Sequence, residues 1–212
     1  MMQKAETPRL VLASNSTARQ TMLRQAGLEF TVLPSNLDES AVKADFQADN
    51  CSRPANAAAI AATLALAKAA AVARDHPDAW VIGADQVLTC EGELFDKAVD
   101  NAEATKILQR LQGRRHELHA AVCVVRDGGT GAGDPWQHIS TARLWMRPLS
   151  DEYIAGYLAQ AGRSVLCSVG CYQIEGLGVQ LFERIEGDHF TILGLPLMPL
   201  LEHLRTAGLL RR

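Results

Sequence analysis

The chain has 212 residues, of which 48% are hydrophobic and 21% are charged, and its formal net charge is -3 at pH 7. This composition supports a buried core and excludes an intrinsically disordered chain, so we expect one domain over residues 1–212. The slightly acidic balance argues against general nucleic-acid binding, because that affinity comes mainly from cationic side chains that neutralise phosphates.

Two further features of the sequence bear on its location in the cell. No apolar run approaches the roughly 18 residues that span a bilayer, and residues 1–9 lack the basic start and apolar stretch of an export signal. The five cysteines include no Cys-x-x-Cys pair, so their spacing indicates neither a disulfide framework nor a zinc site. We expect a cytoplasmic protein without a membrane partner, whose cysteines are packing residues.

The first third of the chain alternates short apolar runs with helical patterns. Residues 10–13 and 30–33 are predicted strands, and residues 17–25 between them are a predicted helix. The alanine-rich residues 56–75 predict a longer helix that ends before Pro77.

The remaining two thirds continue this alternation and then change to a hairpin. Residues 80–83 are a predicted strand, and Asp100 and Glu103 have capping-box spacing ahead of a helix that closes at Gly113. The later predicted elements are strands at 117–126 and 139–148 around a glycine-rich loop at 127–134, a helix at 151–160, a strand-rich stretch to 186 and a helix at 197–207. This order predicts an α/β fold with a mixed sheet flanked by helices.

The first strand-to-helix joint could hold a phosphate. Ser14 and Ser16 precede a helix whose unpaired N–H groups and dipole favour an anion, and Arg19 can project from the same turn. The alternative is ordinary capping of the helix by one of the two serines.

Three carboxylates are candidates for chemistry. Asp38 and Glu39 follow the second predicted strand in a predicted loop, and such hard oxygen ligands suit magnesium or manganese; a solvated turn is the alternative. Asp85 follows a buried strand and Gly83, so we expect it at a strand end, where α/β sheets bind ligands. A capping or turn role for Asp85 is the alternative.

Two lysines and two histidines complete the set of candidates. Lys68 continues the inward row of Ile60 and Leu64 in steps of four, so it either reaches the edge of the apolar stripe or has a buried anionic partner. Lys97 is a loop lysine by its spacing alone. His116 and His119 lie three apart in a predicted strand and so point to opposite faces, which argues against a shared metal.

Taken together, these segments resemble the Maf family of nucleoside triphosphate pyrophosphatases over about residues 9–210. The resemblance rests on Leu10-Val-Leu-Ala-Ser-Asn-Ser16 with Arg19, Leu37-Asp-Glu-Ser40, Lys68, Val81-Ile-Gly-Ala-Asp-Gln-Val87, Lys97 and Leu193-Gly-Leu-Pro-Leu197. It implies a long mixed sheet in two lobes around a nucleotide cleft, a homodimer, and cleavage between the α- and β-phosphates with a divalent cation, Mg²⁺ or Mn²⁺.

The resemblance also suggests roles for individual residues. Asp85 would be the general base and, with Glu39, a metal ligand, while Lys68 and Lys97 would be the catalytic cations. Ser14, Ser16 and Arg19 would bind the phosphates.

Within the family, Gln86 and Glu175 resemble the subgroup that hydrolyses 7-methyl-GTP, because a carboxylate can accept hydrogen bonds from the guanine edge. Ala18 departs from the family pattern at a position associated with substrate choice. Two alternatives therefore remain: a dTTP/UTP pyrophosphatase of the same family, or a non-catalytic nucleotide-binding regulator of septum formation.

Overall fold

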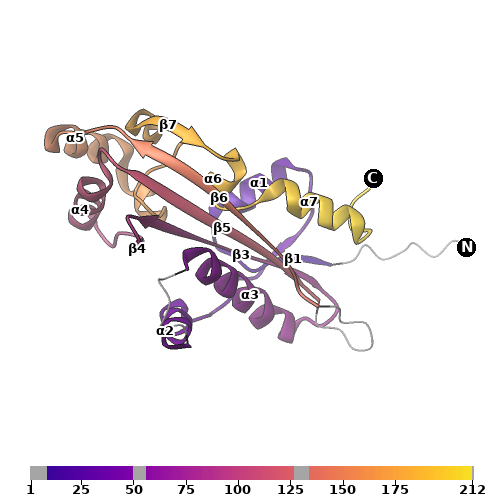
Figure 1. The fold of residues 1–212 in the computed structure, drawn as a ribbon. Coiled ribbons are helices and arrows are strands. Elements are labelled where there is room, and N and C mark those ends of the chain that lie inside the picture. Colours follow the sequence, from indigo (N-terminus) through magenta and orange to yellow (C-terminus); the bar gives the residue numbers. More distant parts are fainter. Residues whose placement is uncertain (1–8, 50–55, 127–133, 212) are drawn as a thin grey trace, which may run out of the picture.

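A computed structural model describes residues 9–49, 56–126 and 134–211 and shows a mixed sheet with helices on both faces (Figure 1). The seven strands are β1 (Leu10–Leu12), β2 (Thr31–Val32), β3 (Trp80–Cys90), β4 (Glu93–Phe95), β5 (Arg115–Val125), β6 (Trp136–Met146) and β7 (Phe182–Glu186). Their order is β2-β1-β3-β5-β6-β7, and β4 pairs with β3. Only the pairs of β1 with β2 and with β3 are parallel among the described residues.

The helices follow the sequence predictions closely in most places. They are α1 (Thr17–Gln25), α2 (Glu39–Asp49), α3 (Ala57–Asp75), α4 (Asn101–Leu111), α5 (Asp151–Ala161), α6 (His189–Ile192) and α7 (Leu197–Thr206), with 3₁₀ helices at Gly162–Cys167 and Leu177–Leu181. The predicted α/β class with a mixed sheet is confirmed, and the bounds predicted for α1 match the structure.

Several predicted elements were wrong. The stretch predicted as strand-rich before residue 186 is mostly 3₁₀ helix and turn, and only β7 is extended. Its apolar residues do pack inward, but Gly170 and Cys171 have positive φ angles of 81° and 58°, which an extended strand cannot contain. Helices α2 and α6 and strand β4 were missed, and most of the predicted glycine-rich loop at 127–134 lies outside the described residues.

Strand β3 is the central element of the fold, and its two sides are paired differently. β5 pairs along its length from Val81 to Cys90. On the other side, β1 pairs only as far as Ile82, and β4 starts only at Leu88. Among the described residues, the intervening positions 83–87 therefore have no strand partner on that side. We call this stretch the notch.

Helix α3 covers one face of the sheet beside the notch. Ile60, Leu64 and Val72 pack on that face, and the close approach requires glycine at position 83, because a Cβ there would lie 2.1 Å from the Ala65 carbonyl oxygen. This contact brings the next turns of α3 directly over the middle of β3 (Figure 1).

Two apolar clusters cover the two ends of the opposite face. One joins β1 and β3 to α1 and α7 through residues such as Leu12, Leu23 and Leu200. The other joins the far ends of β5 and β6 to α4 and α5 through residues such as Leu118, Leu108 and Ile154. Between these clusters, α6 lies against β5 and β6, and Gln86 of β3 donates to its backbone.

The sequence prediction that no segment could span a membrane was wrong on length and composition, since the 19 residues of α3 meet both requirements. Half of its apolar stretch is buried inside the structure, against β3 and β5. A helix that covers a sheet needs the same length and small apolar side chains, which accounts for the composition.

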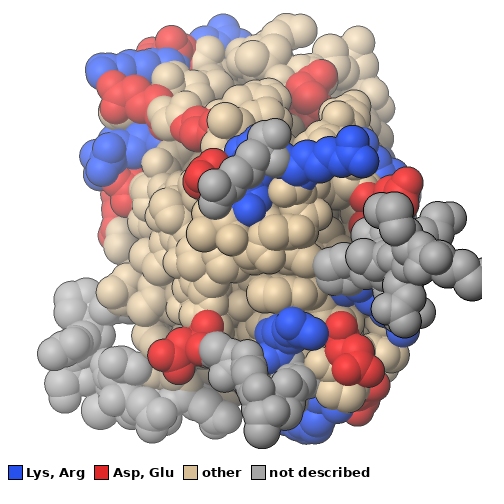
Figure 2. All heavy atoms as spheres, turned by 90° about the vertical axis from the view of Figure 1, so that its right-hand side faces the viewer, with Lys and Arg blue, Asp and Glu red and all other residues tan. Residues whose placement is uncertain are grey.

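The surface seen in Figure 2, which faces the viewer from the right of Figure 1, carries charges of both signs around a broad uncharged area. The coloured cations of this view are not gathered into one patch.

Of the described cysteines, Cys90, Cys123 and Cys171 are buried as predicted, but Cys167 is exposed, so its predicted packing role was wrong.

His116 gives the fold a pH dependence that can be measured. Burial lowers its pKa from 6.5 to about 4, and its Nε2 lies 2.8 Å from the Tyr172 hydroxyl. Below pH 6.5 the unfolded chain takes up a proton that the folded protein does not, so stability is lost as the pH falls towards 4. We expect His116→Gln to remove about 3 kcal/mol of the loss between pH 7 and pH 4, measured by urea denaturation at both pH values. Equal losses in the variant and the wild-type protein would contradict this assignment.

Candidate active site

A cavity of about 1150 Å³ opens at the notch of β3. Its lining includes residues of β3 at the notch, of helix α3, and of the two apolar clusters on the opposite face of the sheet. The sequence-predicted site residues that line it are Ser14, Ser16, Ala18, Arg19, Glu39, Lys68, Asp85, Gln86, Lys97 and Glu175. The fold thus brings together all ten residues, which come from six separate segments of the chain.

Arg19 fills the notch from the side of α1. Its Nη1 donates to the Ala84 carbonyl oxygen at 2.8 Å and to Ser14 Oγ at 3.2 Å, and its Nε donates to the Gly194 carbonyl oxygen at 2.8 Å. The Ala84 carbonyl belongs to the unpaired part of β3, so the guanidinium replaces the missing strand as its donor. Gly194 has a φ angle of 96°, a conformation that favours glycine.

The two serines have different roles in the joint before α1. Ser16 is the N-cap of α1, and its Oγ accepts from the Arg19 backbone N–H at 3.4 Å. Ser14 Oγ accepts both from the Ser16 N–H and from the Arg19 side chain. Ser16 therefore caps α1 and Ser14 orients the arginine, while the phosphate-binding role of the two serines stays a prediction.

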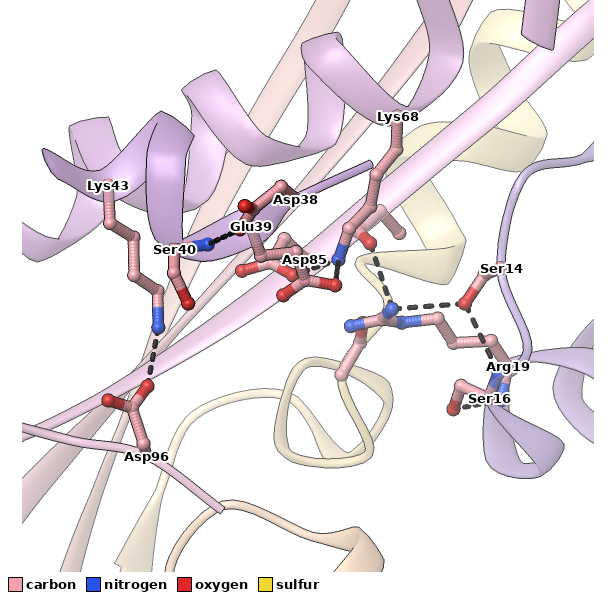
Figure 3. A network of polar contacts seen from close by, with 12 residues as sticks. Ser14, Ser16, Arg19, Asp38, Glu39, Ser40, Lys43, Lys68, Asp85 and Asp96 are labelled. Carbon is pink, nitrogen blue, oxygen red and sulfur yellow. Dashed lines mark hydrogen bonds and ion pairs between the residues drawn. The ribbon is translucent and has the colours of Figure 1, made fainter. Parts of the chain in front are cut away.

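Lys68 lies between two carboxylates, as Figure 3 shows. Its Nζ is 2.6 Å from Asp85 Oδ1 and 2.8 Å from Glu39 Oε1. Lys68 and Asp85 are each only 7% exposed, whereas the Glu39 side chain is half exposed. The inward position predicted from the spacing is confirmed, and of its two explanations the buried anionic partner is the correct one.

The position of two carboxylates differs from the prediction. Asp85 lies in the middle of β3, opposite Ala121 of β5, and not at a strand end; it reaches the cavity because the neighbouring strand β1 has already ended. Glu39 is not in a loop but is the first residue of α2, whereas Asp38 lies in the loop just before it, where its Oδ1 accepts from the N–H groups of Ser40 and Ala41.

Charges within the cavity act on one another. For Glu39, burial raises the pKa, but the hydrogen bond and charge of Lys68, with the charges of Lys97 and Lys43, lower it further, so that the pKa is below its usual value. Burial lowers the pKa of Arg19, an effect that the charges of Asp85 and Glu39 oppose. The guanidinium, the lysines and the two carboxylates therefore form one electrostatic unit.

Gln86 points to the face opposite Asp85. Its Nε2 donates to the carbonyl oxygens of Thr191 and Ile192 at 2.9 and 3.0 Å. Glu175 is exposed and lines the cavity from the segment between the two 3₁₀ helices, and Ala18 lines it from the first turn of α1. The residues expected to read the base thus border the cavity on several sides.

One cation of the cavity was missed from the sequence. Lys43 lies on α2 one turn after Glu39, lines the cavity and forms an ion pair with Asp96 (Figure 3). If the helix had been recognised, the spacing of four residues between Glu39 and Lys43 would have placed both side chains on one face of it.

The charged residues that line the cavity balance one another. Among the described lining residues, the cations are Arg19, Lys43, Lys68 and Lys97, and the carboxylates are Glu39, Asp85, Asp96 and Glu175. A polyphosphate would therefore meet a lining with no net charge, in which Lys43 and Lys68 are paired with carboxylates. Positive charge from outside, or the release of cations from their partners, would favour the binding of such an anion.

Comparison with known proteins identifies relatives over the whole described fold. The family model described as Maf-like protein matches residues 9–207. A nucleoside triphosphate pyrophosphatase of Rhodopseudomonas palustris (strain HaA2) is 52% identical over 201 residues, 95% of each chain. A 7-methyl-GTP pyrophosphatase of Rhizobium johnstonii is 46% identical over 202 residues, 95% of this chain and 98% of the other.

Among solved structures, a nucleoside triphosphatase described as a dITP/XTP pyrophosphatase from Mycobacterium abscessus matches with a TM-score of 0.40 and 14% identity, over 96% of this chain and 98% of the other. The match of the family model over nearly the full length, together with relatives that share about half of the residues, is decisive for membership. The chain belongs to the Maf family.

Proposed function

We propose that the protein hydrolyses 7-methyl-GTP, or a related modified nucleotide, to the monophosphate and pyrophosphate, and so keeps such nucleotides out of nucleic acids. As a member of the Maf family with relatives named nucleoside triphosphate pyrophosphatases, it is a hydrolase of phosphorus anhydrides. The observation that carries the proposal is the ion-paired set of Lys68, Asp85 and Glu39 facing Arg19 in one cavity.

The phosphates would lie between the start of α1 and the lysines. Ser14, Ser16 and Arg19 supply donors from one side, and Lys68 and Lys97 supply positive charge from the other. These groups offset the charge of the ground state and the charge that develops on the leaving pyrophosphate.

Asp85 would act as the general base. A water oxygen forms a bond to the α-phosphorus, the bond from that phosphorus to the bridging oxygen of the leaving group breaks, and the carboxylate takes the proton of the water. Lys68, at 2.6 Å, fixes the orientation of the carboxylate.

The donor set fits a divalent cation that is shared with the substrate. No group of three or more His, Cys, Asp or Glu side chains gathers as a metal site within the described ranges. Glu39 and Asp85 both contact Lys68 Nζ, so the two carboxylates lie close together, and Mg²⁺ is commonly held by one or two carboxylates together with phosphate oxygens. When bound, such an ion neutralises phosphate charge and acts as a Lewis acid. The balanced charge of the cavity lining supports the need for it.

We expect Glu39→Gln to raise the magnesium concentration that gives half-maximal activity by about tenfold or more, because one of the two anionic ligands becomes neutral. The measurement is a titration of pyrophosphate release with Mg²⁺ and with Mn²⁺ at saturating nucleotide. Glu183→Gln, on exposed β7 outside the cavity lining, is the matched control. An unaltered titration in Glu39→Gln would remove Glu39 from the metal site.

The proposal of 7-methyl-GTP rests on Glu175, Gln86 and the relative from Rhizobium johnstonii that carries this name. The carboxylate of Glu175 could accept hydrogen bonds from the N–H groups of guanine and offset the positive charge of the methylated ring. Because Ala18 replaces a side chain in the same cavity, a dTTP/UTP pyrophosphatase is the second candidate. A non-catalytic regulator is the third, although a pure binder needs no general base.

A panel of nucleoside triphosphates with Mg²⁺ or Mn²⁺, scored for pyrophosphate release, separates these candidates. We expect the highest kcat/KM for 7-methyl-GTP. A preference for dTTP and UTP would favour the second candidate, and binding without any release would favour the regulator.

Glu175→Gln tests the reading of the base. We expect its kcat/KM for 7-methyl-GTP to fall about tenfold relative to that for UTP, because the hydrogen bonds to guanine lose their charged acceptor. Gln180→Glu, an exposed position outside the cavity lining, controls for a general change of charge. An unchanged ratio would leave the base-reading role without support.

We also propose that the protein is a cytoplasmic homodimer that binds neither nucleic acid nor membranes. The family resemblance and the net charge of -3 support this view. Sedimentation equilibrium tests the oligomeric state directly, and a monomer at micromolar concentration would contradict it.

A further inference from the structure

Lys43 differs from the buried cations of the cavity in the way it is held. Arg19 donates to two backbone carbonyls and Lys68 lies between two carboxylates, and both side chains are almost fully buried. Within the described part of the chain, Lys43 forms an ion pair with Asp96, and the side chains of the two are 30% and 77% exposed. An exposed ion pair of this kind contributes little net free energy and exchanges readily.

Lys43 lines the proposed substrate cavity. It lies one helical turn after Glu39, the expected metal ligand, and its charge lowers the pKa of that carboxyl. Both Lys43 and Asp96 line the cavity, from α2 and from the loop after β4 respectively (Figure 3). A polyphosphate tail at Glu39 would therefore come within reach of a flexible lysine side chain.

The charge balance of the cavity favours a role for Lys43 in substrate binding. Arg19 and Lys68 can act on a ligand only from the positions that their interior bonds fix, because turning away would leave interior acceptors unpaired, which is costly. Lys43 can turn to a ligand at the cost of leaving Asp96 in water. Moving the lysine from a carboxylate to a phosphate places a cation on the substrate and leaves Asp96 solvated.

We propose that Lys43 is a further ligand of the polyphosphate tail and that Asp96 holds it beside the cavity until the nucleotide replaces that carboxylate. The inference rests on the proposed function, because it takes the ligand to be a nucleoside triphosphate. Lys43 is thereby a substrate-binding residue, whereas Asp96 competes with the substrate for the same cation.

Variants of the two residues test the proposal, since Lys43→Gln and Asp96→Asn both abolish the ion pair but remove opposite charges. If Lys43 binds phosphate, Lys43→Gln should raise KM for the nucleotide roughly tenfold, because a charged hydrogen bond is lost. Asp96→Asn should lower KM or leave it unchanged, because it removes the competitor. In both variants kcat should stay within about twofold, and Lys43→Arg should retain most of the affinity.

Binding of inorganic tripolyphosphate in the presence of Mg²⁺, followed by calorimetry, separates this inference from the proposed function. The probe has no base and needs no turnover. Weaker binding by Lys43→Gln, together with equal or tighter binding by Asp96→Asn, supports the inference even if no nucleotide is hydrolysed. A shift of both variants in the same direction, or no binding of the probe by the wild-type protein, overturns it. Pyrophosphate release by the wild-type protein decides the proposed function separately.

Discussion

Asp85→Asn is expected to lower kcat for pyrophosphate release by about 10²-fold or more while nucleotide binding is retained. The amide is nearly isosteric with the carboxylate, so the fold at β3 is preserved, but it cannot take the proton of the attacking water. Steady-state kinetics and equilibrium binding of the nucleotide, measured on the same preparation, separate the two effects. The result would place Asp85 in the chemical step.

Asp151→Asn is the matched control for this variant, because Asp151 lies at the start of α5, outside the cavity lining. It should keep full activity. If Asp85→Asn releases pyrophosphate at an unchanged rate, the general base must be another group, and the mechanism proposed for this cavity fails.

Lys68→Met is expected to be the most destabilising substitution in the site. It removes the cation that lies 2.6 Å from Asp85 Oδ1 and leaves a carboxylate that is 7% exposed without its partner. Breaking a buried pair in this way costs about 3–5 kcal/mol, which corresponds to a drop in Tm of about 10 °C in a chain of this size. Differential scanning calorimetry at pH 7 measures it.

The double variant Lys68→Met/Asp85→Asn distinguishes a charge effect from a packing effect. Replacement of both charges leaves no ion unpaired, so most of the lost stability should return, while activity stays absent. If the double variant is no more stable than the single one, the loss is due to packing and not to charge.

The elements that were predicted correctly have patterns that lie within a few neighbouring residues of the sequence. Helix α1 has a serine N-cap and a repeating apolar pattern, and its bounds were predicted correctly. The row of Ile60, Leu64 and Lys68 likewise placed the lysine on the buried face, because positions four apart share one side of a helix. These features need no knowledge of the rest of the chain.

The missed elements depend on contacts between distant segments. Aspartate has a low strand propensity, so the sequence predicted that β3 ends before Asp85. The strand continues because β5 pairs with it along this stretch and because Lys68 from α3 neutralises the Asp85 carboxylate. Helix α2 has few large apolar residues, with Val42 and Phe46 partly buried, so its period is weak, and Asp38 reads as a turn residue until its capping bonds are seen.

The candidate site was predicted mainly through its resemblance to a family and only partly through the residues alone. Spacing gave the serines and Arg19 a phosphate-binding role, but it could not show that Arg19 would reach the Ala84 and Gly194 carbonyls, which are 65 and 175 positions away. Lys97 looked unremarkable, and Lys43 was not noticed. Residues that meet only in the folded chain leave no local pattern to read.

The notch in β3 also bears on how the edge of a strand is protected in this fold. An unpaired stretch of strand is a template for a strand from another molecule, and proteins usually protect it. Here the Arg19 guanidinium donates to the Ala84 carbonyl oxygen in this buried stretch, so that one side chain of the candidate site also occupies the unpaired edge of the strand. Loss of Arg19 would therefore leave that carbonyl oxygen without its donor, in addition to any effect on the proposed reaction.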